Sequence, residues 1–360
     1  MNNLRFYVTL LLLLPWAQSI GSQEDLLLPS KSILAGGTIF DIKQDLDGNI
    51  LIATEKGLNI FDGAKCTLYN QWIKVDGENA IASVISLEHD LKGRTWVGRS
   101  DGMSRFDHRT RKAHEVVCRS ASGEPMEVYV KDLASDKNGR IWVATLGHGV
   151  FCIEGDEDVA IQTGTGKAVD FFVNAITMDT NGNIYAGTER NGVQAGRLDD
   201  RRDIHWQTVK GTEQLKVTAI ALTEEGAIFA GTENGLYHIT HNGVCSRIAQ
   251  SEGFYIRCLH VDYRNRLLIG THGQGLQQYN LATEKILPET NPLGSTDLYK
   301  TRVWAIFEDQ GHYLWFGLQG KGVARMPAVN KPFRSLRIPR NTANETDRKS
   351  TRLNSSHITI

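Results

Sequence analysis

One short motif recurs seven times along the chain, and it constrains the fold more than any other feature. Three copies read DLDGNILIAT, DLKGRTWVGR and DKNGRIWVAT. Successive copies are 39 to 47 residues apart, and they open at Asp45, Asp90, Asp136, Asp179, Thr223, Asp262 and Asp309. A period of this length is typical of propellers and solenoids, in which each repeat is one supersecondary unit.

The start of each motif has the composition of a tight turn. An Asp side chain accepts hydrogen bonds from the turn that it opens, and Gly or Asn supplies a positive φ. The fourth residue is Gly in five repeats, and Asn265 and His312 replace it in the last two. We therefore interpret the recurring Asp as part of the scaffold and not as a catalytic acid.

Two further columns of the repeat predict buried strands that pack closely. The residue six positions before each motif is always β-branched: Ile39, Val84, Val130, Val173, Val217, Ile256 and Val303. The residue eight positions after its start is always Ala or Gly: Ala53, Gly98, Ala144, Gly187, Gly231, Gly270 and Gly317. Apolar residues on both faces of a short strand indicate burial on both sides.

Each unit thus resembles four short antiparallel strands without helical periodicity, which is one propeller blade. The sequence predicts an all-β fold, a seven-bladed β-propeller of four-stranded antiparallel blades, over residues 26–338. Either Leu26–Ile33 or Phe333–Leu336 is expected to supply the outer strand of the last blade and so close the ring.

The two ends of the chain differ from the repeats. Residues 1–22 have one Arg, an apolar core at Phe6–Leu14 and a small-residue cleavage pattern, which predicts a secretory signal peptide. The core is shorter than the roughly 20 residues of a membrane span; an uncleaved anchor is the alternative. Residues 339–360 predict a disordered tail, and 347–360, DRKSTRLNSSHITI, resemble a translated sequencing adapter, so the natural protein is expected to continue.

Composition argues against several classes of partner. Forty basic and forty-one acidic residues give a net charge of -1, so no basic face is expected for nucleic acid. The five Cys form no C-x-x-C pair and the eleven His show no metal-ligand spacing. We expect no metal site, no cofactor and no disulfide framework.

The repeated D-x-x-G-x-(L/W)-(I/V)-(A/G)-T-x-x-G-L resembles the two-component regulator propeller repeat. The resemblance covers about residues 30 to 335 and is strongest in the seventh copy, TDLYKTRVWAIFEDQGHYLWFGLQGKGVARMP. It implies the periplasmic sensor region of a bacterial hybrid two-component histidine kinase that responds to polysaccharide breakdown products. It also implies an oligosaccharide ligand, a second propeller and a homodimer partner in an inner-membrane-anchored full-length protein, with no catalysis by this fragment.

Candidate ligand-binding residues lie where the first strand of each unit begins. Aromatic rings stack on sugars, and Lys or Arg pairs with carboxylate or sulfate. The columns five and seven residues before the motif contain Tyr129, Lys131, Phe172, Asn174, Tyr255, Arg257, Arg302 and Trp304. Second-loop residues expected on the same face are Arg99, His148, Arg190, His272 and Lys321.

Three interpretations of these residues stay open. The aromatic side chains also suit the closure of a barrel core, with the cations simply solvated. A secreted carbohydrate-active enzyme would need a unique carboxylate pair or a His–Tyr pair, but the second-loop acids Glu55, Asp101, Glu189 and Glu233 recur around the ring. A protein-interaction scaffold is the third alternative to a ligand sensor.

Overall fold

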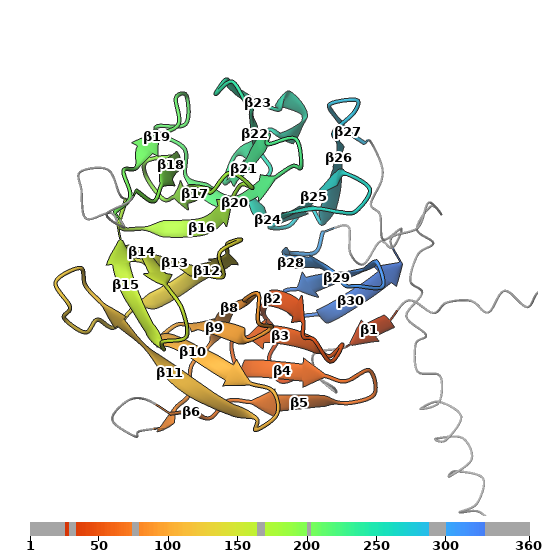
Figure 1. Cartoon of the computed structure of the whole chain (residues 1–360). Coiled ribbons are helices and arrows are strands. Elements are labelled where there is room, and N and C mark those ends of the chain that lie inside the picture. Colours follow the sequence, from red (N-terminus) through yellow and green to blue (C-terminus); the bar gives the residue numbers. More distant parts are fainter. Residues whose placement is uncertain are drawn as a thin grey trace, which may run out of the picture.

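The computed structural model describes residues 26–28, 34–73, 79–163, 170–199, 203–287 and 300–327. In these ranges the chain forms thirty strands and one 3-10 turn, η1 (Ala249–Ser251). The sheets are arranged radially about a common centre (Figure 1). The predicted all-β propeller is therefore confirmed. The predicted signal peptide at 1–22 and the predicted disordered tail at 339–360 lie outside the described residues. Among the described residues, no helix is long and apolar enough to cross a membrane.

The described strands form seven groups of four, each ordered from the centre to the rim. The innermost strands are β2 (Ile39–Gln44), β8 (Val84–His89), β12 (Tyr129–Ser135), β16 (Val173–Met178), β20 (Val217–Leu222), β24 (Ile256–Val261) and β28 (Val303–Glu308). The second strands are β3 (Ile50–Thr54), β9 (Thr95–Arg99), β13 (Ile141–Leu146), β17 (Asn183–Thr188), β21 (Ile228–Thr232), β25 (Arg266–Thr271) and β29 (Tyr313–Leu318).

The two outer layers complete each group. The third strands are β4 (Gly57–Phe61), β10 (Gly102–Asp107), β14 (Gly149–Ile153), β18 (Val193–Arg197), β22 (Gly235–Ile239), β26 (Leu276–Asn280) and β30 (Gly322–Pro327). The outer strands are β5 (Cys66–Tyr69), β11 (Lys112–Arg119), β15 (Val159–Thr163), β19 (Gln207–Thr208), β23 (Cys245–Arg247), β27 (Lys285–Ile286) and β1 (Leu26–Leu28). A short extra pair, β6 (Trp72–Ile73) and β7 (Asn79–Ala80), follows the first group.

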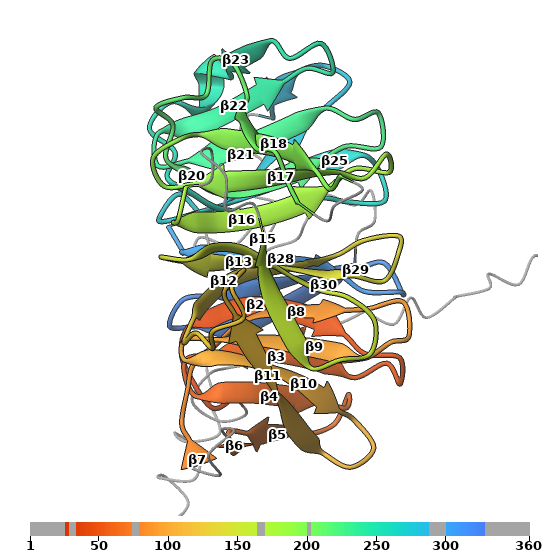
Figure 2. The same cartoon turned by 60° about the vertical axis from the view of Figure 1, so that its left-hand side comes forward.

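The innermost strands contact one another in a closed circle: β2, β8, β12, β16, β20, β24, β28 and β2 again. The turned view shows β12, β16 and β20 in succession along one side (Figure 2). The N-terminal strand β1 pairs with β30, with Leu26 opposite Arg325 and Leu28 opposite Val323. The first of the two predicted closing segments thus supplies the outer strand of the last group, while Phe333–Leu336 lies outside the described residues.

The second and third groups are joined at the rim, which the repeat did not predict. Outer strands β11 and β15 pair in parallel, with Val117 opposite Val159 and Arg119 opposite Ile161. The two groups therefore form one eight-stranded sheet. This pairing covers two outer edges that the repeat alone would leave open to solvent.

The motif Asp has the structural role that the sequence predicts. Asp136 is buried, and its Oδ1 accepts the N–H groups of Asn138 and Arg140 at 2.8 and 3.0 Å. Its Oδ2 accepts hydrogen bonds from Arg140 Nε and from Trp142 Nε1, the latter at 3.1 Å. Asn265 and His312, which replace the turn Gly, have φ of 57° and 58°. In the third repeat the motif therefore binds its turn to the second strand of the same blade.

The Ala/Gly column and the β-branched column contact each other between neighbouring blades. A Cβ added to Gly187 would lie 2.6 Å from Cγ1 of Val217, and one added to Gly317 would lie 2.7 Å from Cγ2 of Ile39. Both distances are too short for real side chains. The second pair joins the last blade to the first, so the same contact that packs neighbouring blades also closes the ring.

We predict that Gly187→Ala lowers the free energy of unfolding by about 1–3 kcal/mol, because the new methyl overpacks the contact with Val217. Chemical denaturation measures the change. In a Val217→Ala background the same substitution should cost clearly less, since the clashing methyl groups are gone. Equal costs in the two backgrounds would show that the blade contact is not the cause.

We predict that Asp136→Ala destabilises the protein by about 1–3 kcal/mol, because a buried Trp142 N–H and the turn amides lose their acceptor. Asp136→Thr is the matched variant, since Thr223 occupies this position in the fifth repeat and its Oγ1 accepts the Ala227 N–H at 3.1 Å. In thermal unfolding, the melting temperature should be highest for the wild type, lower for Asp136→Thr and lowest for Asp136→Ala. A fully stable Ala variant would contradict the scaffold role.

Candidate functional site

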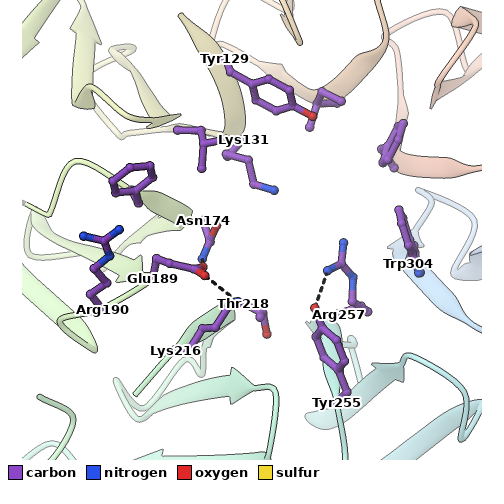
Figure 3. A pocket seen from close by; sticks show the side chains of 14 residues that line it. Tyr129, Lys131, Asn174, Glu189, Arg190, Lys216, Thr218, Tyr255, Arg257 and Trp304 are labelled. Atoms are coloured by element: carbon purple, nitrogen blue, oxygen red, sulfur yellow. Dashed lines mark hydrogen bonds and ion pairs between the residues drawn. The ribbon is translucent and has the colours of Figure 1, made fainter. Parts of the chain in front are cut away.

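A cavity of about 500 Å³ opens at the centre of the ring, at the ends where the innermost strands begin. Each of the seven innermost strands contributes the residue five positions before the motif to the lining: Phe40, Ile85, Lys131, Asn174, Thr218, Arg257 and Trp304. The volume of the cavity falls within the roughly 300–1,000 Å³ that is usual for small-molecule sites. Figure 3 shows five of these side chains converging from separate blades: Lys131, Asn174, Thr218, Arg257 and Trp304.

A β-bulge places this residue in every blade. In each innermost strand the pairing with the second strand shifts register around a single unpaired residue, and that residue is the lining one. In β12, for example, Val130 pairs with Thr145 and Asp132 with Ala144, so Lys131 is left over. A bulge bends the strand and re-aims the extra side chain. The bulges thus direct seven variable side chains toward the axis.

One side of the cavity combines aromatic rings with an arginine. The guanidinium carbon of Arg257 lies 4.4 Å from the Trp304 ring centroid and 5.7 Å from that of Tyr255. Arg257 Nη1 also donates to Tyr255 Oη at 3.3 Å, and Phe40 packs against Trp304 with centroids 5.6 Å apart. Two aromatic faces therefore hold the guanidinium in place.

Lys131 extends into the same space from the third blade, next to Asn174 (Figure 3). Burial, together with the nearby charge of Arg257, lowers the pKa of its ammonium group, and Asp132 and Glu189 offset this only in part. Among the described residues, neither Lys131 nor Arg257 forms an ion pair with a carboxylate. The cavity therefore contains two positive charges that no ion pair neutralises.

The opposite side is polar but ion-paired. Lys216 Nζ lies 2.6 Å from Glu189 and 2.8 Å from Glu233, and Asn174 Nδ2 donates to Glu189 at 2.9 Å. Burial opposes ionisation of Glu189, but hydrogen bonds from Lys216 and Asn174 outweigh it and lower the pKa of the carboxyl. Thr218 Oγ1 donates to the Ile256 carbonyl at 2.6 Å. This wall offers hydroxyl, amide and carboxylate groups; Lys216 is already ion-paired there, and Arg190 stacks on Phe172 at the rim.

The cavity continues along the axis into a second space of about 210 Å³. Asp41 and Asp132 line it, and each accepts a backbone N–H from the next blade, Leu87 and Ile176 respectively. Burial raises the pKa of Asp41 to about 6 and that of Asp132 to about 7. The sequence places small residues at this position in the other five blades: Ser86, Ala175, Ala219, Cys258 and Ala305.

The structure brings eight of the thirteen candidate residues together. Those that line the cavity are Tyr129, Lys131, Phe172, Asn174, Arg190, Tyr255, Arg257 and Trp304. At the rim, the Arg190 guanidinium carbon lies 4.9 Å from the Phe172 ring centroid. Whether these residues bind a ligand stays a prediction, but their common location agrees with the reasoning from the repeat.

Five candidates lie outside the cavity lining. Arg99 is fully buried, pairs with Asp101 and Glu115 and lies 5.2 Å from the Trp72 centroid, so the expectation that it faces a ligand is wrong. His272 stacks on Tyr255, with ring centroids 5.1 Å apart. The remaining three form local hydrogen bonds. Arg302 donates to Gln319, Lys321 donates to Thr301, and the backbone carbonyl of His148 accepts from Gln162.

Sequence reasoning missed part of the lining. The missed residues are Phe40, Ile85, Leu146, Glu189, Lys216 and Thr218. Four of them occupy the same two columns of the repeat, so reading every blade at those columns would have found them. Glu189 was noted only as one of several recurring loop acids. No cluster of metal-ligating side chains occurs in the described ranges.

Comparison with known proteins agrees with the repeat and the fold. The family model for the two-component regulator propeller matches residues 124–147, in the third repeat, which confirms the resemblance there. An extracellular domain assigned to a hybrid two-component system of B. thetaiotaomicron matches with a TM-score of 0.67 and 20% identity, over 86% of this chain and 42% of that one. No curated protein matches the chain.

Two further solved structures share the fold. An extracellular domain assigned to a one-component system of B. thetaiotaomicron has a TM-score of 0.65 and 19% identity, over 84% of this chain and 40% of that one. Virginiamycin B lyase from Staphylococcus aureus has a TM-score of 0.61 and 13% identity, over 85% of this chain and 99% of that one. The chain spans about two fifths of the length of the two B. thetaiotaomicron domains. At these identities the similarity establishes the fold.

We predict that Asp132 makes stability fall as the pH rises from about 4 to 7. Its pKa is 3.8 before folding and about 7 in the fold, so the folded state binds more protons in this range and loses that advantage on ionisation. Each pKa unit corresponds to about 1.4 kcal/mol. Asp132→Ala, which restores the small residue of most repeats, should flatten the profile measured by denaturation at successive pH values. An unchanged slope would contradict the assignment.

Proposed function

We propose that this propeller is the ligand-sensing part of an exported bacterial signalling protein, and that its axial cavity binds an oligosaccharide released from a polysaccharide. The observation that carries the proposal is the cavity itself, in which aromatic rings and polar groups from separate blades converge. Aromatic faces suit the apolar faces of sugar rings, while amide, hydroxyl and charged groups suit their hydroxyls. The third-repeat match to the regulator propeller family supports the same assignment.

The wider context follows from the same comparisons and is part of the proposal. The similar B. thetaiotaomicron structures are extracellular domains, which supports a periplasmic location for this propeller. The intact protein would add a second propeller, a membrane anchor and a histidine kinase, and it would act as a dimer. In this view the propeller itself performs no catalysis, and binding in the cavity changes how it contacts the rest of the protein.

A direct test is calorimetry of the purified chain against neutral and acidic oligosaccharides from plant and host polysaccharides. We predict that Trp304→Ala weakens binding of any ligand found by about two- to tenfold, because loss of an aromatic face costs about 0.5–1.5 kcal/mol. Arg302→Ala is the matched control, since Arg302 lies two residues before Trp304, immediately before β28, and outside the cavity lining. Equal affinity of wild type and Trp304→Ala would remove the cavity as the binding site.

The same samples distinguish the alternative functions. A carbohydrate-active enzyme would convert the bound oligosaccharide to new products, which chromatography of the mixture detects. A pure interaction scaffold would bind no oligosaccharide at all. Binding without turnover is the result that the sensor proposal predicts.

A further inference from the structure

Charge is distributed unevenly in the axial cavity, and this asymmetry carries information about its ligand. Lys216 is held between Glu189 and Glu233, so its charge is already compensated. Lys131 and Arg257 have no such partner among the described residues. Around the ring, Asn174 and Thr218 lie between Lys131 and Arg257, so the two unpaired cations reach one space from different blades and the ion-paired groups border it between them (Figure 3).

The region around Arg257 and Trp304 also has hydrogen-bond donors without acceptors. In the described part of the chain, Arg257 Nε and Trp304 Nε1 are buried and have no partner. A buried donor without an acceptor is costly, and a charged one more so. Burial and then the nearby charge of Arg257 lower the pKa of Lys131, and the carboxylates of Asp132 and Glu189 offset this only in part. An oxyanion entering between Lys131 and Arg257 would supply acceptors and negative charge together.

Arg257 is held in position before any ligand arrives. Trp304 and Tyr255 flank the guanidinium at 4.4 and 5.7 Å, and Tyr255 Oη accepts one of its N–H groups. A planar guanidinium that is fixed in this way can offer two parallel donors to a carboxylate or sulfate. Lys131 adds a second, less directional charge from the third blade, across the cavity.

The wall formed by Glu189 and Asn174 favours neutral groups over anions. Glu189 is ionised, as its lowered pKa indicates, and it lies on the cavity wall beside Asn174. Its charge disfavours a second anion there, while its oxygen atoms and the amide of Asn174 can bond to hydroxyl groups. The wall therefore suits the neutral, hydroxylated part of a ligand.

We propose that Lys131 and Arg257 form a recognition site for one oxyanion of an acidic saccharide, and that Glu189 directs the uncharged part of the ligand to the wall beside Asn174. The saccharide part of this inference rests on the proposed function, whereas the anion site does not. The ligand is thus a saccharide with a carboxylate or sulfate at one end and neutral hydroxyl groups at the other. Glu189 is the residue that determines specificity.

The test titrates the full chain with glucuronate, glucose and sodium sulfate, and then with an acidic disaccharide and its neutral counterpart. Glucuronate should bind at least about tenfold more tightly than glucose. Lys131→Met and Arg257→Met, which keep the side-chain stem and remove the charge, should each weaken glucuronate binding about ten- to hundredfold. Arg302→Met is the matched control and should bind as wild type does. Comparison of glucuronate with sulfate identifies the preferred oxyanion.

Glu189→Gln provides the second arm. A disaccharide with acidic groups at both ends should bind the wild type weakly and this variant several-fold more tightly, because the repelling charge is gone. Equal binding of acidic and neutral sugars, with both weakened by Trp304→Ala, would overturn the anion site and leave the proposed function intact. Anion binding that depends on Lys131 and Arg257 but is no tighter when the anion carries a sugar would keep the anion site and overturn the proposed function. Unchanged anion affinity in both Met variants would overturn the inference.

Discussion

The β-bulge in each innermost strand is the feature on which the candidate site depends. On one side of the bulge, a β-branched residue packs against the Ala or Gly of the neighbouring blade, as Val217 does against Gly187. The bulged residue itself is free of the ladder and turns to the axis. Because packing and pairing are carried by the flanking residues, the axial residue can vary without cost to the ring. The repeat therefore holds the scaffold constant and exposes seven independent positions.

Those seven positions give the cavity its chemistry. A ring of identical residues would create a symmetric channel, whereas here Trp304 and Arg257 share the ring with Asn174 and Thr218. Charge follows the same division, since the ion pairs of Glu189 and Lys216 lie on one side only. An asymmetric cavity can orient a ligand, and an oriented ligand presents a defined end to whatever lies at the mouth. Such a site suits recognition more than bulk transport through the axis.

The fold could be predicted from the sequence because its determinants are local and repeated seven times. Asp136, its turn and Trp142 form one hydrogen-bonded unit within seven residues, and each copy reinforces the interpretation. The candidate site was predicted in part, since the columns containing Lys131 and Arg257 stood out by composition. Thr218 and Ile85 have no such character and only their register reveals them. Arg99 was misplaced because its ion pairs with Asp101 and Glu115 depend on side-chain packing that no column shows. The parallel pairing of β11 with β15 likewise arises from long-range contact.

The central claim is that the bulged residues of the innermost strands form a ligand site and that the rest of the repeat serves as scaffold. A crystal structure of the protein with a bound acidic oligosaccharide tests it most directly. We predict density in the axial cavity, with an oxyanion within hydrogen-bond distance of Arg257 and a sugar ring against Trp304. Density on the outer rim or at the Asp-turn face, with an empty axial cavity, would contradict the account.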